Sequence, residues 1–140
     1  MKEYEHKHIV GFEETSLVGN VYYANFVRWQ GRCREMFLRE RVEGILPMLQ
    51  NDFALVTTKV SCEFIAELTA FDELIIRMSL GALKQNRIAM RFEYWQQTKE
   101  GEKLVARGEQ EVACMRRSDS GLIPLDRVPE NLRNALESEF

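Results

Sequence analysis

The chain has few of the residues from which disulfide scaffolds and metal centres are built. Among 140 residues there are three cysteines and two histidines. Cys33, Cys62 and Cys114 stand far apart with no Cys-x-x-Cys pair, and His6 and His8 both lie near the N-terminus. A disulfide framework needs more cysteines, and a zinc site needs its Cys and His ligands at closer spacing. We therefore expect free, reduced thiols, no metal ion and a cytoplasmic location.

Long apolar runs and phosphate-binding glycine motifs are also missing. No stretch approaches the roughly 20 apolar residues that span a membrane. The N-terminus carries Lys2, Glu3 and Glu5 in place of the apolar segment of a signal peptide. No glycine pattern matches the loops that hold nucleotide phosphates. These absences predict a protein that binds neither a membrane nor an organic cofactor.

The charge balance argues against nucleic acid as a partner. The formal net charge is -3 and the sequence pI is about 5.5, so a polyanion would be repelled unless the basic residues gathered on one surface. Hydrophobic residues make up 45% of the chain, which is ordinary for a globular protein. We expect residues 1–140 to form a single domain.

Hydrophobic periodicity predicts one long helix among strands. Apolar residues recur at helical spacing between residues 21 and 42, at Phe26, Trp29, Cys33, Met36 and Phe37. Alternating patterns typical of half-buried strands follow. The expected strands cover residues 4–12, 56–64, 74–80, 88–94 and 104–115. A connector containing Pro47 follows the helix, and a short C-terminal helix is expected at 131–137 after Pro129.

This order of elements predicts an α+β hotdog fold, in which a five-stranded antiparallel sheet wraps a long central helix. One helix covers only one face of such a sheet, and an edge strand would stay open. We therefore expect a homo-oligomer, either a dimer or a tetramer. Thr57, Ser61, Trp95 and Val105 are the candidate subunit contacts on the outer face. The alternative is that these are ordinary exposed side chains.

The start of the long helix is a candidate site for stabilising negative charge. The first backbone N–H groups of a helix lack intrahelical partners, and the helix dipole favours an anion there. A polar loop at residues 13–20, which contains Gly19, leads into this helix. The amides near Tyr22 and Tyr23 are therefore candidate donors to the oxyanion of an acyl-transfer reaction. The alternative is a loop that only caps the helix.

The sequence of this segment resembles a known enzyme family. The run VGNVYYANFVRWQ is similar to acyl-CoA thioesterases of the 4-hydroxybenzoyl-CoA type within the hotdog superfamily, with matching residues at Gly19, Val21, Tyr23, Phe26 and Trp29. The longer string EETSLVGNVYYANFVRWQGRCREMFL resembles still more closely the thioesterases of enediyne polyketide biosynthesis. Its most distinctive part is RWQGRCRE, residues 28–35.

The resemblance also marks individual residues. Ser16 stands where the general family has a catalytic Asp and the enediyne branch an Asn, so this chain departs from both. Arg34 matches the charged residue that the enediyne branch marks as functional. It borders the apolar stripe, where it would form a polar pair with Gln30 or extend to the surface. Glu13 and Glu14 are expected at a solvated strand end.

The resemblance implies hydrolysis of an acyl thioester without a catalytic carboxylate. The implied substrate is a 3-oxoacyl thioester on an acyl carrier protein or on CoA, with a conjugated polyene released and then decarboxylated. The Tyr23 amide would polarise the carbonyl, while Ser16, Asn20 and Arg34 would position water. Six aromatic and apolar side chains either belong to the plain core or line the acyl site, where they would suit a flat polyene: Tyr22, Phe26, Met36, Met78, Met90 and Phe92. The alternatives are a general acyl-CoA thioesterase and a non-catalytic acyl-binding hotdog module.

Overall fold

One antiparallel sheet, three α-helices and a 3-10 turn make up residues 2–139, which the computed structural model describes. The strands are β1 (Tyr4–Ile9), β2 (Phe53–Phe64), β3 (Glu73–Lys84), β4 (Arg87–Thr98), β5 (Gly101–Ser118) and β6 (Gly121–Pro124). The helical elements are η1 (Phe12–Glu14), α1 (Ala24–Arg41), α2 (Ile45–Gln50) and α3 (Glu130–Glu139). The strand order is β1-β3-β4-β5-β2, with β6 paired to the end of β5.

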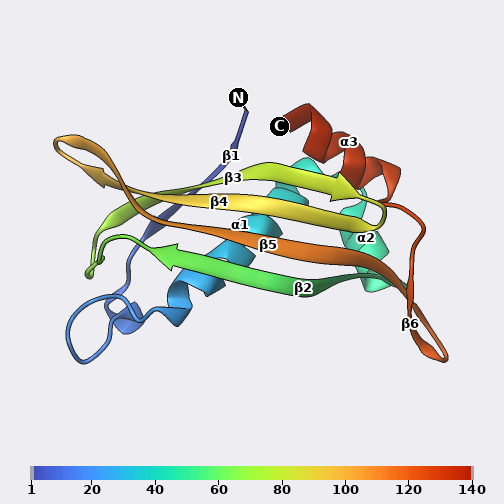
Figure 1. Ribbon diagram of the computed structural model, residues 1–140, viewed down its shortest axis with the longest axis horizontal. Helices are drawn as coiled ribbons and strands as arrows, with labels where there is room; N and C mark the ends of the chain where they lie inside the picture. Colours follow the sequence, from blue (N-terminus) through green and yellow to red (C-terminus); the bar gives the residue numbers. More distant parts are fainter. Residues whose placement is uncertain (1, 140) are drawn as a thin grey trace.

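The sheet curls around α1, which lies along its inner face (Figure 1). The apolar stripe of α1 is buried at Phe26, Trp29, Cys33 and Phe37, as its helical spacing predicts. The alternating residues of β3 and β4 meet this stripe. They are Leu74, Ile76 and Met78 on β3 and Ile88, Met90, Phe92 and Tyr94 on β4. The predicted α+β hotdog fold is confirmed.

Three short elements were not predicted: β6, α2 and η1. The sheet has a sixth strand, β6, whose four residues are all exposed, so no burial period marks it in the sequence. The expected connector after α1 contains the six-residue helix α2. Pro47 lies in the first turn of α2, where its missing N–H leaves no hydrogen bond unmade. The first strand is shorter than predicted, because β1 ends at Ile9 and η1 follows.

A β-bulge in β2 reverses the side-chain phase that the sequence predicts. Thr57 pairs with Val112 and Lys59 with Glu111, so Thr58 is an extra residue in the ladder. Thr57, expected on the outer face, therefore points toward α1, where its hydroxyl accepts a hydrogen bond from Arg34. After the bulge Phe64 faces inward and its ring contacts Phe26.

The other three candidate subunit contacts differ in their burial. Val105 is fully buried in the core, so its placement on the outer face was wrong. Ser61 is exposed, and Trp95 is partly exposed.

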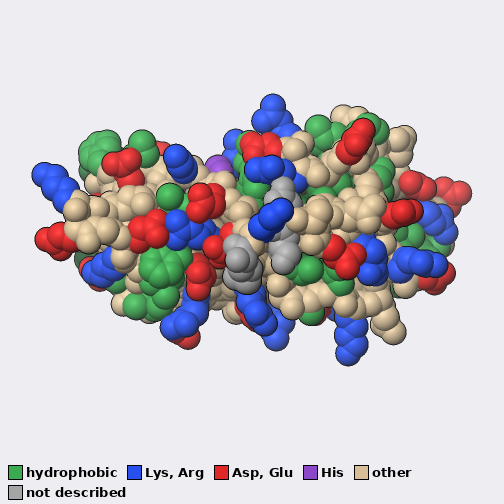
Figure 2. Space-filling view, turned by 90° about the horizontal axis from the view of Figure 1, so that it is seen from above, with side chains coloured by type: hydrophobic (Ala, Val, Ile, Leu, Met, Phe, Trp, Pro, Cys, Tyr) green, Lys and Arg blue, Asp and Glu red, His purple; other side chains and the backbone are tan. Residues whose placement is uncertain are grey.

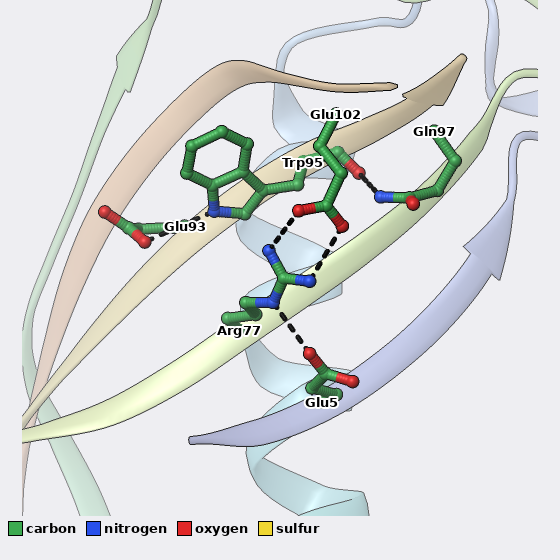
Figure 3. Close-up of polar contacts among 6 residues, drawn as sticks. All are labelled: Glu5, Arg77, Glu93, Trp95, Gln97 and Glu102. Atoms are coloured by element: carbon green, nitrogen blue, oxygen red, sulfur yellow. Dashed lines mark hydrogen bonds and ion pairs between the residues drawn. The ribbon is translucent and has the colours of Figure 1, made fainter. Parts of the chain in front are cut away.

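Arg77 joins three strands on the outer face of the sheet (Figure 3). Its Nε donates to Glu5 on β1 at 2.7 Å, and its two Nη atoms donate to the Glu102 carboxylate on β5 at 2.9 and 2.7 Å. The guanidinium also lies over the Trp95 ring, 5.8 Å from its centre. Hydrogen bonds to Glu102 and then Glu5 raise the pKa of Arg77. Since the side chains of Glu5 and Glu102 are 47% and 37% exposed, solvent screens these ion pairs and we expect only a modest contribution to stability.

No helix among residues 2–139 is both long and apolar enough to cross a lipid bilayer.

Candidate active site

The loop between η1 and α1 closes on itself as a tight turn. The Ser16 amide donates to the Asn20 carbonyl at 2.8 Å, the Gly19 amide donates to the Ser16 carbonyl at 2.9 Å, and Thr15 pairs with Val21. Gly19 has φ +90°, a left-handed conformation that glycine adopts at low cost. The turn brings together Ser16 and Asn20, both predicted as site residues.

The side chains of Ser16 and Asn20 form a neutral hydrogen-bonded pair. The Ser16 hydroxyl donates to Asn20 Oδ1 at 2.9 Å, and Asn20 Nδ2 donates to Glu67 at 3.1 Å. Because the Ser16 hydrogen is engaged, its oxygen remains able to accept a hydrogen bond. An acceptor of this kind orients a water molecule without removing a proton from it.

The start of α1 offers fewer free amides than the sequence predicts. The Tyr22 amide donates to the Glu14 carbonyl at 2.9 Å, so Tyr22 is not a free oxyanion donor. The Asn25 and Phe26 amides donate to the Tyr22 and Tyr23 carbonyls within the first turn. Tyr23 is the N-cap residue of α1, and no hydrogen bond of its amide is found among the described residues. Of the two predicted donors, only Tyr23 remains.

Glu14 anchors the loop to the fold, although the sequence suggested a solvated strand end for it. Its carboxylate accepts hydrogen bonds from the Gly11 amide at 2.8 Å and the Trp29 indole at 2.7 Å. The same carboxylate lies 2.8 Å from His8 Nε2. Its backbone carbonyl accepts from the Tyr22 amide and the Asn25 side chain. Glu13, by contrast, is exposed, as expected.

The contacts of Glu14 argue against a role as general base. Burial tends to raise its pKa, but the donors on Gly11, Trp29 and His8 outweigh burial and hold the pKa below its ordinary value. A base with a lowered pKa and occupied oxygens is a poor proton acceptor at neutral pH. The structure therefore assigns this carboxylate to loop architecture.

Arg34 lies between α1 and the inner face of the sheet, and polar side chains hold one of its nitrogens. Its Nη1 donates to Gln110 Oε1 at 2.9 Å and to Thr57 Oγ1 at 3.2 Å. Burial lowers the pKa of the guanidinium, which nevertheless stays protonated at neutral pH. The predicted direct pair with Gln30 is not formed, since Gln110 lies between the two side chains.

The predicted site residues fall into two groups within one chain. Ser16, Asn20 and Tyr23 lie in the loop and at the start of α1. Arg34 follows Tyr23 by eleven residues, which is about 16 Å along the helix at 1.5 Å per residue. A groove along α1 is lined by both Glu14 and Arg34. The chain therefore does not bring Arg34 to the loop by itself.

Most residues expected to line an acyl site are packed in the core. Phe26, Met78, Met90 and Phe92 are all at least 97% buried and belong to one hydrophobic cluster. Tyr22 is instead 49% exposed beside Tyr23. These four side chains therefore belong to the plain core in the conformation described, which is one of the two alternatives that the sequence predicts.

Among residues 2–139 no three His, Cys, Asp or Glu side chains gather as metal ligands. Acidic and basic side chains alternate over the face seen in Figure 2. A hollow on the outer face of the sheet is lined by the ion pairs Arg91–Glu109 and Arg107–Glu63. This hollow contains none of the predicted site residues.

Sequence reasoning missed Gln110 and misplaced Thr57. Gln110 interrupts the inward-facing series Ala106, Gly108, Val112 and Cys114 on β5. A polar residue at an inward-facing position of an otherwise small or apolar series is a signal that could have identified it. Thr57 carries no comparable signal, because its direction depends on the bulge.

Comparison with known proteins gives one family. Residues 10–136 match the thioesterase-like superfamily. Among solved structures, a dynemicin thioesterase superposes with a TM-score of 0.93 and 47% identity, covering 98% of this chain and 96% of the other. Its crystal structures reveal induced-fit and allosteric effects upon polyene binding. Among curated proteins no sequence matches the chain.

More distant structures share the fold. A 4-hydroxybenzoyl-CoA thioesterase variant in complex with 4-hydroxybenzoyl-CoA has a TM-score of 0.87 and 14% identity, covering 97% of this chain and 99% of the other. A 1,4-dihydroxy-2-naphthoyl-CoA thioesterase from Synechocystis has a TM-score of 0.79 and 22% identity, with 96% and 95% covered.

Glu14→Gln should destabilise the protein more than it slows any reaction. The glutamine side chain places an N–H donor where the Glu14 carboxylate accepts hydrogen bonds. We therefore expect a loss of about 1–3 kcal/mol in unfolding free energy at pH 7. The pKa of Glu14 is lower in the folded protein than its ordinary value. The extra stability of the parent protein over Glu14→Gln is therefore fully present above the ordinary carboxyl pKa near 4.3. It fades as the pH falls through the folded value. Urea unfolding at pH 7 and at pH 3.5 measures this difference.

Glu13→Gln is the matched control for this prediction, because Glu13 is exposed, and it should leave stability unchanged at both pH values. A thousandfold loss of thioester hydrolysis in a well-folded Glu14→Gln protein would contradict the assignment and restore a carboxylate mechanism.

Proposed function

Because this chain belongs to the thioesterase-like superfamily and is an acyl thioester hydrolase, we propose that it cleaves a long 3-oxoacyl thioester carried by an acyl carrier protein. The acyl group would be a conjugated polyene. The support is the 47% identity over 98% of the chain to a thioesterase whose structures concern polyene binding. Residues 10–136, which match the thioesterase-like superfamily, include the site loop and Arg34.

One observation carries the proposed mechanism: the loop presents a neutral Ser16–Asn20 pair where a base would be expected. A thioester carbonyl accepting a hydrogen bond from the Tyr23 amide is polarised for attack. Water held by the Ser16 oxygen adds to the carbonyl carbon, and the C–S bond then breaks. The departing thiolate takes up the proton that the water releases, leaving a free 3-oxo acid.

The second reaction needs little from the protein. A 3-oxo acid transfers its carboxyl proton to its own 3-oxo oxygen within a six-membered ring, while the C–C bond breaks and CO₂ leaves. The resulting enol returns to the ketone in water. Decarboxylation thus follows release without a cofactor. A positioned general base typically contributes 10²–10⁴-fold, so we expect hydrolysis to be slow.

We further propose that the complete site forms between two copies of the chain. The loop and Arg34 are separated by about 16 Å along α1 in one protomer, and β2 is an edge strand that pairs only with β5 among the described strands. Gly31, midway along α1, has open space where a Cβ would lie. A second copy joined at these surfaces would place its Arg34 near the first copy's loop.

The proposed reaction is tested by release assays followed by mass spectrometry. Polyenyl 3-oxoacyl, saturated 3-oxoacyl and simple acyl groups are each offered on a carrier protein and on CoA. We expect the polyenyl 3-oxoacyl carrier to be cleaved fastest, with a ketone one carbon shorter as product. Faster cleavage of simple acyl-CoA would favour a general acyl-CoA thioesterase. Binding of every substrate without turnover would indicate a non-catalytic acyl-binding module.

Arg34→Ala should lower the rate of thioester cleavage by about 10²-fold, because the guanidinium supplies fixed donors to developing negative charge. Arg34→Lys should recover only part of the rate, since an ammonium lacks the planar arrangement of donors. Arg28→Ala and Arg39→Ala, at exposed positions on the same helix, are the controls. Steady-state rates are compared with circular dichroism spectra. Full activity in Arg34→Ala would remove Arg34 from the mechanism.

The protein should be at least a dimer, and its sites should be shared between protomers. Light scattering at micromolar concentration should give a multiple of 16.4 kDa. Mixing Ser16→Ala with Arg34→Ala protomers after unfolding and refolding should restore activity, because each hybrid dimer then contains one intact site. Random pairing predicts recovery of about a quarter of parental activity. A stable monomer, or no recovery in proven hybrids, would refute the shared site.

A further inference from the structure

We propose that Gln110 and Gln30 are positioning residues that hold the Arg34 guanidinium through a one-way chain of hydrogen bonds. The catalytic consequence of this chain rests on the proposed function, whereas the geometry does not. Arg34 Nη1 donates to Gln110 Oε1 at 2.9 Å. Gln110 Nε2 donates to Gln30 Oε1 at 3.2 Å. Gln30 Nε2 donates to the Ser61 carbonyl at 2.9 Å. This chain of hydrogen bonds thus runs from α1 to β5, back to α1 and on to β2.

The two ends of the hydrogen-bond chain, the Arg34 guanidinium and the Ser61 carbonyl, determine the orientation of both glutamine amides. A guanidinium only donates hydrogen bonds, and a backbone carbonyl only accepts them. The oxygen of Gln110 must therefore face Arg34, which turns its nitrogen toward Gln30. The nitrogen of Gln30 must face Ser61, which turns its oxygen toward Gln110. Rotation of either amide by 180° would bring two donors or two acceptors together, so this arrangement is fixed by its chemistry.

Burial makes this orientation strict. Gln30 is fully buried and Gln110 is 96% buried, so water does not replace a lost partner. Gly108 on β5 provides the space for Gln30. A Cβ added there would lie 2.2 Å from Gln30 Nε2 and 2.5 Å from the Ser61 carbonyl. Since Gly108 does not have a positive φ, its lack of a side chain serves packing.

The hydrogen-bond chain holds Arg34 by Nη1 and does not involve Nε. Nη1 makes both hydrogen bonds, to Gln110 and to Thr57, and the Thr58 bulge supplies the direction of Thr57. Arg34 Nε is buried and has no partner among the described residues. A buried donor without a partner is unfavourable unless a ligand oxygen or an ordered water accepts from it. In the proposed site, a substrate oxygen that reaches this buried position would be the missing acceptor for Nε.

The proposal predicts that the glutamines matter for catalysis only through Arg34. Gln110→Met keeps the side-chain volume but removes the acceptor, so the charge of Arg34 remains while its direction is lost. We expect kcat to fall about tenfold with little change in KM, since binding of the carrier and acyl chain is not altered. Gln30→Met, which leaves Gln110 without its acceptor, should have a smaller effect in the same direction.

A double-mutant cycle separates positioning from general stability. In the Arg34→Ala background, Gln110→Met should change kcat less than twofold, because the residue it positions is absent. Gln97→Met is the matched control. Gln97 donates to the Trp95 carbonyl at 3.0 Å on the outer side of the sheet, beside the Arg77 cluster (Figure 3). It should leave kcat unchanged. An equal loss of kcat from Gln110→Met in both backgrounds would overturn the proposal.

A spectroscopic measurement tests the geometry without any turnover. In protein labelled with ¹⁵N at arginine, the Nε–H of Arg34, assigned from its absence in Arg34→Lys, should exchange slowly with solvent. Gln110→Met and Gln30→Met should each accelerate this exchange at least tenfold in protein whose circular dichroism is unchanged, and Gln97→Met should not. Exchange unaffected by both variants would refute the chain. Failure of every thioester to be hydrolysed would refute the proposed function, and the exchange experiment would still decide the positioning role.

Discussion

The amide and hydroxyl groups buried between α1 and the wrapped face of the sheet need hydrogen-bond partners there, because water does not reach them. The cost of an unpaired buried amide is about 1–3 kcal/mol, a sizeable part of the stability of a domain this small. Gln30 meets this constraint through Gln110 and the Ser61 carbonyl. The Tyr94 hydroxyl meets it by donating to the Phe26 carbonyl at 2.6 Å. These partners fix how α1 is rotated against β5 and β4, and so fix where Arg34 points.

The same constraint explains how the chain uses its carboxylates. Near the site loop, the partly buried carboxylate is that of Glu14, and donors from the backbone, Trp29 and His8 surround it. Such a carboxylate stabilises the loop because it stays charged, but for that reason it does not accept a proton at neutral pH. Ser16 and Asn20, which are held in place by this loop, remain neutral. In the proposed mechanism these neutral groups position water in place of a proton-accepting base, which suits an already activated thioester.

Much of the fold could be predicted from the sequence because its periodicities are long and regular. The helical stripe from Phe26 to Phe37 and the alternation in β3 and β4 extend over many residues, so single exceptions do not hide them. The bulge at Thr58 could not be predicted, because no glycine or proline marks it. The one inserted residue reverses which face of the sheet the preceding side chains of β2 point to. α2 and β6 are too short to show a period.

The candidate site was less predictable for a related reason. Gln30 and Arg34 were expected to pair because they are four residues apart on one helix. They are instead joined through Gln110, which is 76 residues from Arg34 in the sequence. Glu14 looked like any acidic residue at a strand end, since its role depends on Trp29 and His8. Spacing reveals contacts within an element, whereas contacts between elements depend on strand register.

The packing of the core restricts where the proposed acyl chain can lie. Phe26, Met78, Met90 and Phe92 fill the space between α1 and the sheet. The cavity beside Arg34, bounded by Leu55, Ile88 and Leu132, is too small for a polyene. Among the described residues, the groove lined by both Glu14 and Arg34 runs along α1 and is open to solvent in a single protomer, so it is the candidate path for an extended chain bound without rearrangement. Covering an apolar substrate there requires a second surface, which a second copy of the chain would provide in the proposed dimer. Assembly would then both exclude water from the acyl chain and bring the loop of one protomer to the Arg34 of its neighbour.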